Sequence, residues 1–500
     1  MSLKIPMAGA LGCGPDCGCG PEAADPAGSY DEILGSTRAW CPECQKTEPA
    51  LYAANSRGVY MDRLCPSGGS RKNKVAETAK WFSERVGPGL ELGPAVGLKP
   101  VTDGCPFDCG LCRAHLGRLR LPIFSVTNQC QLACPICFTH NRKDLTYHKT
   151  PGELEKILEV IEAQSETLDL LNITGGEPTL HPALPELLEQ CARRSFDRIS
   201  VNSNGLKLAE DEELVKKIKS TGAQVILSLD TLDPLTSIIV HGRDIVGAKL
   251  SALERLERLE VPTILLIVWM PGINDREIGL LIRRYFARTF IKGVTIQTVT
   301  YTGYHGSRFE PKKRATIEEV ENGLSDANIR PTDFFAHGSY HALCYSVAYY
   351  LIDSAAMVPL TSLAEPEILT RATSFGYLMR PTDELSRSVR DKINSLWAAG
   401  ASLEQLRLIK KLVSALFTAA DGPGRDELQV QNNLRRAAES TGIIKTVCLH
   451  AHMDQDNFDL ARVATCGDLV PEEDGSFRPA CAYNLIYRCR DPRFWAEEGR

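Results

Sequence analysis

The chain has 500 residues, of which 43% are hydrophobic, and its formal net charge is −6 at pH 7. This length allows two to four domains with a large core. The absence of a basic excess excludes a protein that binds nucleic acid through a positively charged surface. No run of 18 or more apolar residues occurs, so no stable membrane span is expected. Residues 1–10 lack the apolar core of a signal peptide, and we expect a cytoplasmic protein.

Eighteen cysteines are unusual for a chain with no secretory signal. A reducing cytoplasm disfavours disulfides, so metal or redox chemistry is the better explanation. Scattered buried thiols are the alternative, and Cys191, inside a helical pattern, fits it. The other cysteines cluster with Pro and Gly between them, which favours metal binding.

The first segment, residues 1–30, is rich in Gly, Pro and Ala and is predicted to be a flexible tail. Its cysteines Cys13, Cys17 and Cys19 are either ligands or part of a mobile segment. Residues 31–118 follow as an N-terminal metal-binding segment. Cys41-Pro-Glu-Cys44 and the later Cys65-Pro predict a knuckle for zinc or a single iron, with three ligands evident.

A triplet spaced Cys-x3-Cys-x2-Cys closes this segment, formed by Cys105, Cys109 and Cys112. It offers three thiolates, whereas a closed zinc or iron–sulfur site takes four protein ligands. No predicted strand leads into it. We interpret the triplet as an auxiliary iron–sulfur site whose fourth ligand comes from the C-terminal region, with zinc as the alternative.

Residues 119–305 alternate between predicted strands and helices. A capping box, Thr150-Pro-Gly-Glu153, opens an amphipathic helix. The alternation predicts a parallel sheet with right-handed crossovers, and six units favour a partial (βα)6 TIM-type barrel. The expected strands are 121–127, 168–174, 198–203, 224–230, 263–270 and 293–300. The later helices are expected at 183–194, 211–221, 247–259 and 275–286.

The same cysteine spacing recurs just after the first of these strands, at Cys130, Cys134 and Cys137. The carboxyl ends of barrel strands carry the active sites of barrel enzymes. Three thiolates at such a place leave one iron open to a ligand that is not protein.

Polar groups follow the next three strands. The second strand runs into Gly175-Gly176-Glu177-Pro178, where a glycine pair lets the backbone approach a ligand and Glu177 supplies an acceptor for an amine. The third ends in Ser203 and Asn204, which suit ribose hydroxyls. The fourth ends in Ser228 and Asp230. Ordinary turn chemistry is the alternative at these last two strand ends.

The remaining residues, 306–500, are predicted to form a helical, cysteine-containing domain. Residues 317–441 are expected to be mostly helical, including a helix at 403–417. A second metal-binding lobe is expected to fold back onto the barrel; its cysteines are Cys344, Cys448, Cys466 and Cys481. His450 and His452 are interpreted as ordinary residues rather than ligands.

The cysteine loop with Ile136 before Cys137, followed by Gly-Gly-Glu-Pro, resembles the radical S-adenosylmethionine (SAM) superfamily. The resemblance implies a [4Fe–4S] cluster on Cys130, Cys134 and Cys137 that binds SAM. It implies contacts from 175–177 to the SAM amine and from 203–204 to the ribose, with Arg243 for the carboxylate. One-electron cleavage of SAM would generate a 5′-deoxyadenosyl radical that abstracts hydrogen from a substrate.

A closer resemblance covers nearly the whole chain and is carried by the knuckle, both triplets, Pro271-Gly-Ile-Asn-Asp275, Thr302-Gly303 and Pro479-Ala-Cys481. This pattern resembles the group of class D radical SAM methyltransferases and tetraether lipid synthases. The group implies one or two auxiliary [4Fe–4S] clusters and a mononuclear iron or zinc site. The chain departs from it at Pro66-Ser-Gly-Gly69, where a histidine is expected before the glycine.

The expected function is therefore C–C bond formation at an unactivated carbon, by methyl transfer to a pterin-like small molecule. Radical coupling of lipid alkyl chains is the first alternative. A non-catalytic iron–sulfur electron-transfer protein is the second, although such a carrier has no use for a SAM pocket. A reductant such as flavodoxin or ferredoxin is the implied protein partner.

Overall fold

The computed structural model describes residues 30–495 except 68, 88–99, 110, 142–143, 165–168, 195, 353–356, 381, 401 and 403–443. The predicted tail with Cys13, Cys17 and Cys19 and the predicted helix at 403–417 lie outside these residues. The described chain begins with an antiparallel sheet that the sequence reading did not anticipate. Its strands are β1 (Glu32–Trp40), β2 (Thr47–Asn55), β3 (Gly58–Cys65) and β4 (Gly69–Ala76), and helix α1 (Ala79–Arg85) follows.

The six predicted parallel strands are all present and pair with one another in chain order. They are β5 (Leu121–Ser125), β6 (Leu170–Thr174), β7 (Arg198–Ser203), β8 (Gln224–Ser228), β9 (Thr263–Trp269) and β10 (Ile291–Thr298). Parallel pairing in this order brings all six carboxyl ends to one edge of the sheet. The loops that carry the predicted site residues therefore meet there.

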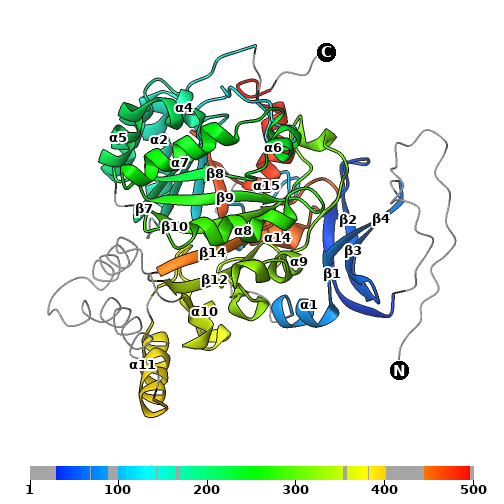
Figure 1. Ribbon diagram of the computed structural model, residues 1–500. Helices are drawn as coiled ribbons and strands as arrows, with labels where there is room; N and C mark the ends of the chain where they lie inside the picture. The colour runs from blue at the N-terminus through cyan, green and yellow to red at the C-terminus, as the bar shows by residue number, and fades with distance from the viewer. Residues whose placement is uncertain are drawn as a thin grey trace.

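Helices connect these strands and cover the outer face of the sheet with their apolar sides (Figure 1). The capping box at the start of α2 is confirmed, because Thr150 Oγ1 accepts the Glu153 N–H and the Glu153 carboxylate accepts the Thr150 N–H. The helices are α2 (Pro151–Gln164), α3 (Leu184–Ala192), α4 (Leu206–Glu210), α5 (Glu212–Ser220), α6 (Pro234–His241), α7 (Val246–Arg258) and α8 (Asp275–Tyr285). Cys191 is fully buried in α3, as the alternative for this residue predicted.

Strands from the C-terminal third extend the sheet at both edges. Strand β14 (Ile444–His450) pairs in parallel with β10, and β15 (Asp468–Pro471) pairs in parallel with β5. Strand β12 (Tyr345–Ile352) joins β14 in the antiparallel sense, and β16 (Phe477–Pro479) joins β15. These pairings place the C-terminal cysteines beside the six-stranded part of the sheet.

The expectation of mostly helical structure at 317–441 is wrong for its first part. Residues 345–352 form a strand because every one of them is buried, and such apolar runs suit a strand that is covered on both faces. Strands β11 (Phe335–Ala336) and β13 (Met357–Pro359) pair with β12. The described helices of this part are α9 (Ile317–Asn322), α10 (Pro366–Ala372) and α11 (Asp383–Ala398).

Short helices complete the chain: α14 (Leu460–Ala464), α15 (Ala480–Ala482), the π-turn η7 (Tyr483–Tyr487) and the 3-10 turn η8 (Arg488–Arg490). Figure 1 shows the β1–β4 sheet at one side of the molecule next to α14, and an isolated bridge joins Ala39 to Asp459 there. None of the helices in the described ranges combines the length and apolar character that a membrane crossing requires.

Candidate active site

The loop with Cys130, Cys134 and Cys137 begins five residues after β5 and lies at the carboxyl edge of the sheet. All three side chains are half-buried. Burial raises the pKa of Cys134 to about 12, and the nearby Cys137 and Cys130 thiols add to this shift. Three thiols that disfavour one another's charge suit a site where a cation offsets their ionisation.

The glycine pair after β6 packs against the backbone of this loop. A Cβ at Gly175 would lie 2.5 Å from the Thr127 carbonyl oxygen, and one at Gly176 would lie 2.3 Å from the Gln129 carbonyl oxygen. The Gly176 and Glu177 amides donate to those two carbonyls, at 2.8 and 2.7 Å. Glycine is therefore required here for contact with the cysteine loop, which the sequence reading had attributed to approach of a ligand.

The Glu177 carboxylate, which is 1% exposed, ties together the ends of two strands. Its Oε1 accepts the Ser203 hydroxyl at 2.9 Å and the Thr179 hydroxyl at 2.6 Å, and its Oε2 accepts the Asn204 amide at 2.7 Å. Burial raises the pKa of Glu177, and these hydrogen bonds oppose that shift. The side chains of Glu177 and Ser203 are thus engaged within the fold, and Pro178 opens the next 3-10 turn, η2 (Pro178–Leu180).

These contacts change which groups can face a ligand. The carbonyls of Gly175 and Gly176 accept no hydrogen bond within the described part of the chain, whereas the Glu177 carboxylate accepts several. Asn204 contacts Gln131 of the cysteine loop at 3.4 Å through its side-chain amide. Of the two residues predicted to bind ribose, Ser203 and Asn204, it is Asn204 that lies at the edge of the cysteine loop.

A second pair of glycines packs against the far side of the loop. Gly303, at φ +77°, lies so close that a Cβ would fall 2.5 Å from the Phe138 carbonyl carbon. The Gly306 amide donates to the Cys137 carbonyl at 3.0 Å. The positive φ and the close approach together require glycine at 303. The Thr302-Gly303 motif therefore supports the cysteine loop from the end of β10.

Two buried basic side chains that the sequence reading did not assign lie beside Cys134. His241 ends α6, and its Nδ1 is 3.7 Å from Cys134 Sγ while its Nε2 is 3.5 Å from Asp230 Oδ2. Lys249 Nζ donates to the Ser228 carbonyl at 2.6 Å and to its hydroxyl at 2.8 Å. Burial lowers the pKa of Lys249, and the charges of Asp230 and Cys134 oppose that shift.

A signal for Lys249 was present in the sequence, because the residue stands on the apolar stripe of α7. A charged residue at such a position is buried with a partner or serves a site. His241 carried no comparable signal. Arg243, the predicted carboxylate ligand, is exposed two residues beyond α6, and its role stays a prediction.

The knuckle thiols form the tightest group in the described residues. Cys65 Sγ lies 3.5 Å from Cys41 Sγ and 3.6 Å from Cys44 Sγ. Thiolates around one tetrahedral ion, at about 2.3 Å from the metal, lie about 3.8 Å apart. The predicted knuckle residues therefore come together at the spacing of a single ion. Ser67, where a histidine was expected, has its hydroxyl 3.6 Å from Cys65 Sγ.

The first triplet comes together in a different setting. A hydrogen bond between the thiols lowers the pKa of Cys105 and raises that of Cys109, and burial raises Cys109 further. The charges of Cys112 and Cys466 act on Cys109 in the same direction. Cys466, 354 positions further along the chain than Cys112, is therefore a neighbour of this triplet.

Three of the four predicted C-terminal cysteines line one small cavity, and the fourth does not. Cys344, Cys466 and Cys481 face this space together with His452 and Arg462. Arg462 Nε donates to Cys344 Sγ at 3.1 Å, and His452 Nδ1 lies 3.6 Å from Cys481 Sγ. Cys448 instead sits in a separate apolar cluster on β14, where burial raises its pKa to about 12.

A stacked ring pair joins this cavity to the cysteine loop. The rings of Phe138 and His452 stack with centroids 5.2 Å apart, and His452 contacts His450 at 4.1 Å. Because β14 runs parallel to β10, both histidines stand at the same sheet edge as the predicted site. Only the pairing of β14 reveals this position, and the interpretation of both histidines as ordinary residues stays a prediction.

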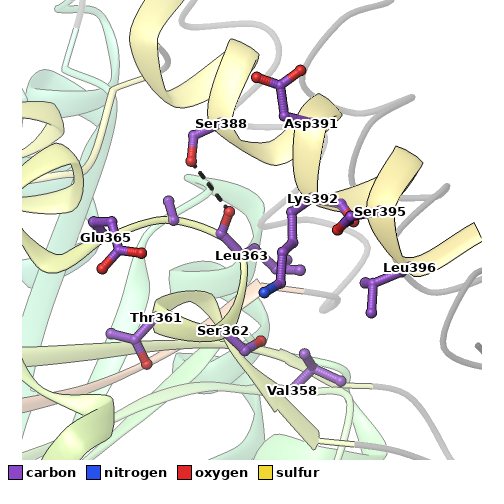
Figure 2. A pocket seen from close by; sticks show the side chains of 11 residues that line it. Val358, Thr361, Ser362, Leu363, Glu365, Ser388, Asp391, Lys392, Ser395 and Leu396 are labelled. Carbon is purple, nitrogen blue, oxygen red and sulfur yellow. Dashed lines mark hydrogen bonds between the residues drawn. The ribbon is translucent and has the colours of Figure 1, made fainter. Parts of the chain in front are cut away.

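A further cavity lies away from this chemistry. It measures roughly 630 Å³ and separates the 3-10 turn η6 (Leu360–Ser362) from α11. Figure 2 shows Lys392 reaching from α11 into this space and Ser388 bonded to the Leu363 carbonyl, at 3.4 Å. Its lining holds no cysteine or histidine, so the cysteine loop remains the candidate active site.

Comparison with known proteins adds a family to this geometry. Residues 124–284 match the family described as the Radical SAM superfamily. A 7,8-dihydro-6-hydroxymethylpterin dimethyltransferase of Methanocaldococcus jannaschii is 25% identical over 90% of this chain and 94% of its own length. A probable GTP 3′,8-cyclase of Pyrococcus abyssi is 32% identical over 32% of this chain, which corresponds to half of the cyclase.

Solved structures also resemble parts of the chain. Streptococcus suis SuiB covers 55% of it, and 67% of its own chain, at 16% identity and a TM-score of 0.35. The radical SAM methyltransferase TsrM of Kitasatospora setae, bound to cobalamin and a [4Fe–4S] cluster, covers 49% of it and 48% of its own chain. Its identity is 15% and its TM-score 0.29.

Proposed function

We propose that the chain is a radical SAM enzyme that forms a C–C bond by methyl transfer to a pterin-like small molecule, and the match of residues 124–284 to the Radical SAM superfamily supports this. The observation that carries this proposal is the near full-length similarity to a pterin dimethyltransferase. The cofactors of a radical SAM enzyme are a [4Fe–4S] cluster and SAM. Cys130, Cys134 and Cys137 are the proposed cluster ligands.

The neighbouring groups fit SAM in a specific way. The backbone carbonyls of Gly175 and Gly176 are proposed to accept from its amine, and Asn204 to bind its ribose. Asp230 is proposed to orient His241, and Ser228 to hold Lys249, beneath Cys134. When bound, the cluster and SAM together supply the radical that removes hydrogen from the substrate. The protein orients the reactants and excludes water.

Two further metal centres belong to the proposal. Cys41, Cys44 and Cys65 would hold a mononuclear iron or zinc, which their sulfur distances support. Auxiliary [4Fe–4S] sites would draw on Cys105, Cys109 and Cys112 and on the C-terminal cavity. Cys466, which neighbours both groups, is the proposed fourth thiolate of the first triplet.

Substrate-derived deuterium tests the proposal most directly. The anaerobically purified enzyme, with SAM and a low-potential donor such as flavodoxin, would be incubated with deuterated dihydropterin or with deuterated lipid chains. Deuterium in 5′-deoxyadenosine from the pterin alone is the expected result. Label from the lipid alone would replace the pterin with lipid coupling, and no SAM cleavage at all would leave an electron carrier.

A further inference from the structure

A buried arginine from the end of the chain reaches the cysteine loop. Arg488, in η8, is 2% exposed and lies 363 positions after Ser125, the last residue of β5. Its Nη1 donates to Ser125 Oγ at 2.7 Å, ahead of the loop. Its Nε donates to the His140 carbonyl at 2.8 Å, beyond the loop. One guanidinium thus spans the entry and the exit of the segment that carries all three thiols.

Arg488 forms no direct ion pair with a carboxylate among the described residues. Each of its hydrogen-bond acceptors is neutral, and the nearby Asp491 and Glu472 are bound by Arg493, at 2.7 and 3.0 Å. Burial lowers the pKa of Arg488, as expected for a cation withdrawn from water. A buried charge costs several kcal/mol unless something offsets it. The charges of Asp491 and Glu472 and the Phe494 ring, 4.2 Å from the guanidinium carbon, offset part of this cost, and negative charge in the site would offset more.

A chain of hydrogen bonds leads from the guanidinium to a thiol. Arg488 Nη2 donates to Asn141 Oδ1 at 2.7 Å, and Asn141 Nδ2 donates to Thr139 Oγ1 at 2.8 Å. Thr139 Oγ1 lies 3.4 Å from Cys137 Sγ. Because this oxygen already accepts from Asn141, its own hydrogen is free to point at the sulfur. The chain is therefore oriented so that a thiolate at Cys137 accepts its last bond.

We propose that Arg488 is a positioning residue, which acts through Asn141 and Thr139 to stabilise negative charge on Cys137 and on the cluster that it holds. This inference rests on the proposed cluster at Cys130–Cys137. Hydrogen bonds to cluster sulfurs and nearby charge set the reduction potential of iron–sulfur clusters. A donor chain that starts at a buried cation favours the more negative, reduced state. The C-terminal turn thereby becomes part of the electron-accepting machinery.

Four substitutions in the full-length enzyme separate this role from simple support of the fold. Arg488→Gln removes the charge, and Arg488→Lys keeps the charge but loses the planar three-way contact. Thr139→Val removes only the hydroxyl that faces Cys137 and leaves Arg488 bonded to Asn141. Arg490→Gln, on the exposed end of the same turn, is the matched control.

The measurement is the midpoint potential of the SAM-responsive cluster by EPR-monitored titration, with iron and sulfide content as the occupancy check. Arg488→Gln and Thr139→Val are both expected to shift the midpoint potential to more negative values. The shift in Arg488→Gln is expected to be the larger of the two. Arg488→Lys should fall between Arg488→Gln and the wild type, and Arg490→Gln should match the wild type. In the double variant Arg488→Gln/Thr139→Val the potential should shift by less than the sum of the two single shifts, because both residues act along one chain of hydrogen bonds.

Two results would overturn the inference. A wild-type potential in cluster-replete Thr139→Val would break the last link of the chain, even if Arg488→Gln failed to fold. An equal shift in Arg490→Gln would show a nonspecific charge effect. Failure of the proposed cluster at Cys130–Cys137 looks different, because the wild-type enzyme would then show no SAM-responsive cluster signal, and a substrate other than a pterin would leave these potentials unchanged.

Discussion

The knuckle and the cysteine loop each offer three thiols, yet they are built in opposite ways. In the knuckle, sulfurs on two neighbouring turns of a small antiparallel sheet approach within 3.6 Å. In the loop, the thiols of Cys130, Cys134 and Cys137 are held at a sheet edge by glycines from two other strand ends. The two sites therefore differ in the surroundings that hold their sulfurs and set their charge, although both have three thiols.

The surroundings also differ in their use of buried basic groups. In the knuckle, Cys41 contacts Glu43, whose carboxylate pairs with Arg63 and Arg71. The cysteine loop instead has His241 and Lys249 on one side and Arg488 on the other. Burial lowers the pKa of His241 to about 3, so the cations beside this loop are Lys249, which has Asp230 near it, and Arg488.

Removing a loop thiol should have the largest effect. We expect Cys134→Ala to reduce reductive cleavage of SAM to background, because the cluster loses one of its three protein ligands. The measurement is 5′-deoxyadenosine formation under anaerobic conditions. Cys191→Ala, a buried thiol in α3 away from the loop, is the control and should keep the activity. Intact cleavage in Cys134→Ala would contradict the assignment of the active cluster.

Crowding the loop should come next. In Gly176→Ala the new Cβ would meet the Gln129 carbonyl at 2.3 Å, which forces backbone movement. We expect a loss of about 1–3 kcal/mol in stability, with loss of cluster iron. Denaturant unfolding and iron analysis measure these effects. Gly247→Ala, where a Cβ meets nothing within 4 Å, should show neither, and equal behaviour of the two would refute the packing argument.

Asp468 is buried and lies outside both the knuckle and the cysteine loop. Its titration should make the stability of the chain depend on pH, and this dependence serves as an internal reference. Burial raises its pKa to about 6 from 3.8, so the metal-free fold is favoured with Asp468 protonated. Its stabilising contribution is full below the unfolded pKa and is lost as pH rises through 6. The loss amounts to about 3 kcal/mol at most.

Unfolding of the metal-free chain between about pH 4 and 7 measures this slope. Asp468→Asn should flatten it, because the amide cannot titrate. If the pH dependence of stability persisted unchanged in Asp468→Asn, another titrating group would be responsible for it.

The smallest expected effect on SAM chemistry comes from the knuckle. We expect Cys44→Ser to lose one metal ion per chain while SAM cleavage remains at the wild-type level. Metal analysis alongside the 5′-deoxyadenosine assay tests this. If Cys44→Ser lost SAM cleavage together with the metal ion, the knuckle and the cysteine loop would be functionally coupled, which would contradict this prediction.

The sequence predicted the parts of the fold that depend on local pattern. The bounds of β7 match the predicted strand, and the capping box at Thr150 is as expected, because periodicity and caps are written in neighbouring residues. The cysteine loop was found because its spacing is itself the signal. Its relation to β5 followed from the strand pattern alone.

The remainder depends on contacts between distant residues. The parallel partners of β14 and β15, which are β10 and β5, lie more than 145 residues away in sequence, and no local pattern encodes such pairing. Arg488 lies in an unremarkable polar turn, and only the folded chain brings it to Ser125. The hydrogen bond between Ser203 and Glu177 could not be predicted for the same reason, since it joins the ends of two strands.

The central claim is that the cluster on Cys130, Cys134 and Cys137 leaves one iron open for SAM. Electron-nuclear double resonance on the reduced enzyme, with SAM labelled with ¹⁵N in its amine and ¹⁷O in its carboxylate, tests this most directly. The account predicts hyperfine coupling of both labels to the cluster in the wild type. Cluster-replete enzyme that shows no coupling from either label would contradict it.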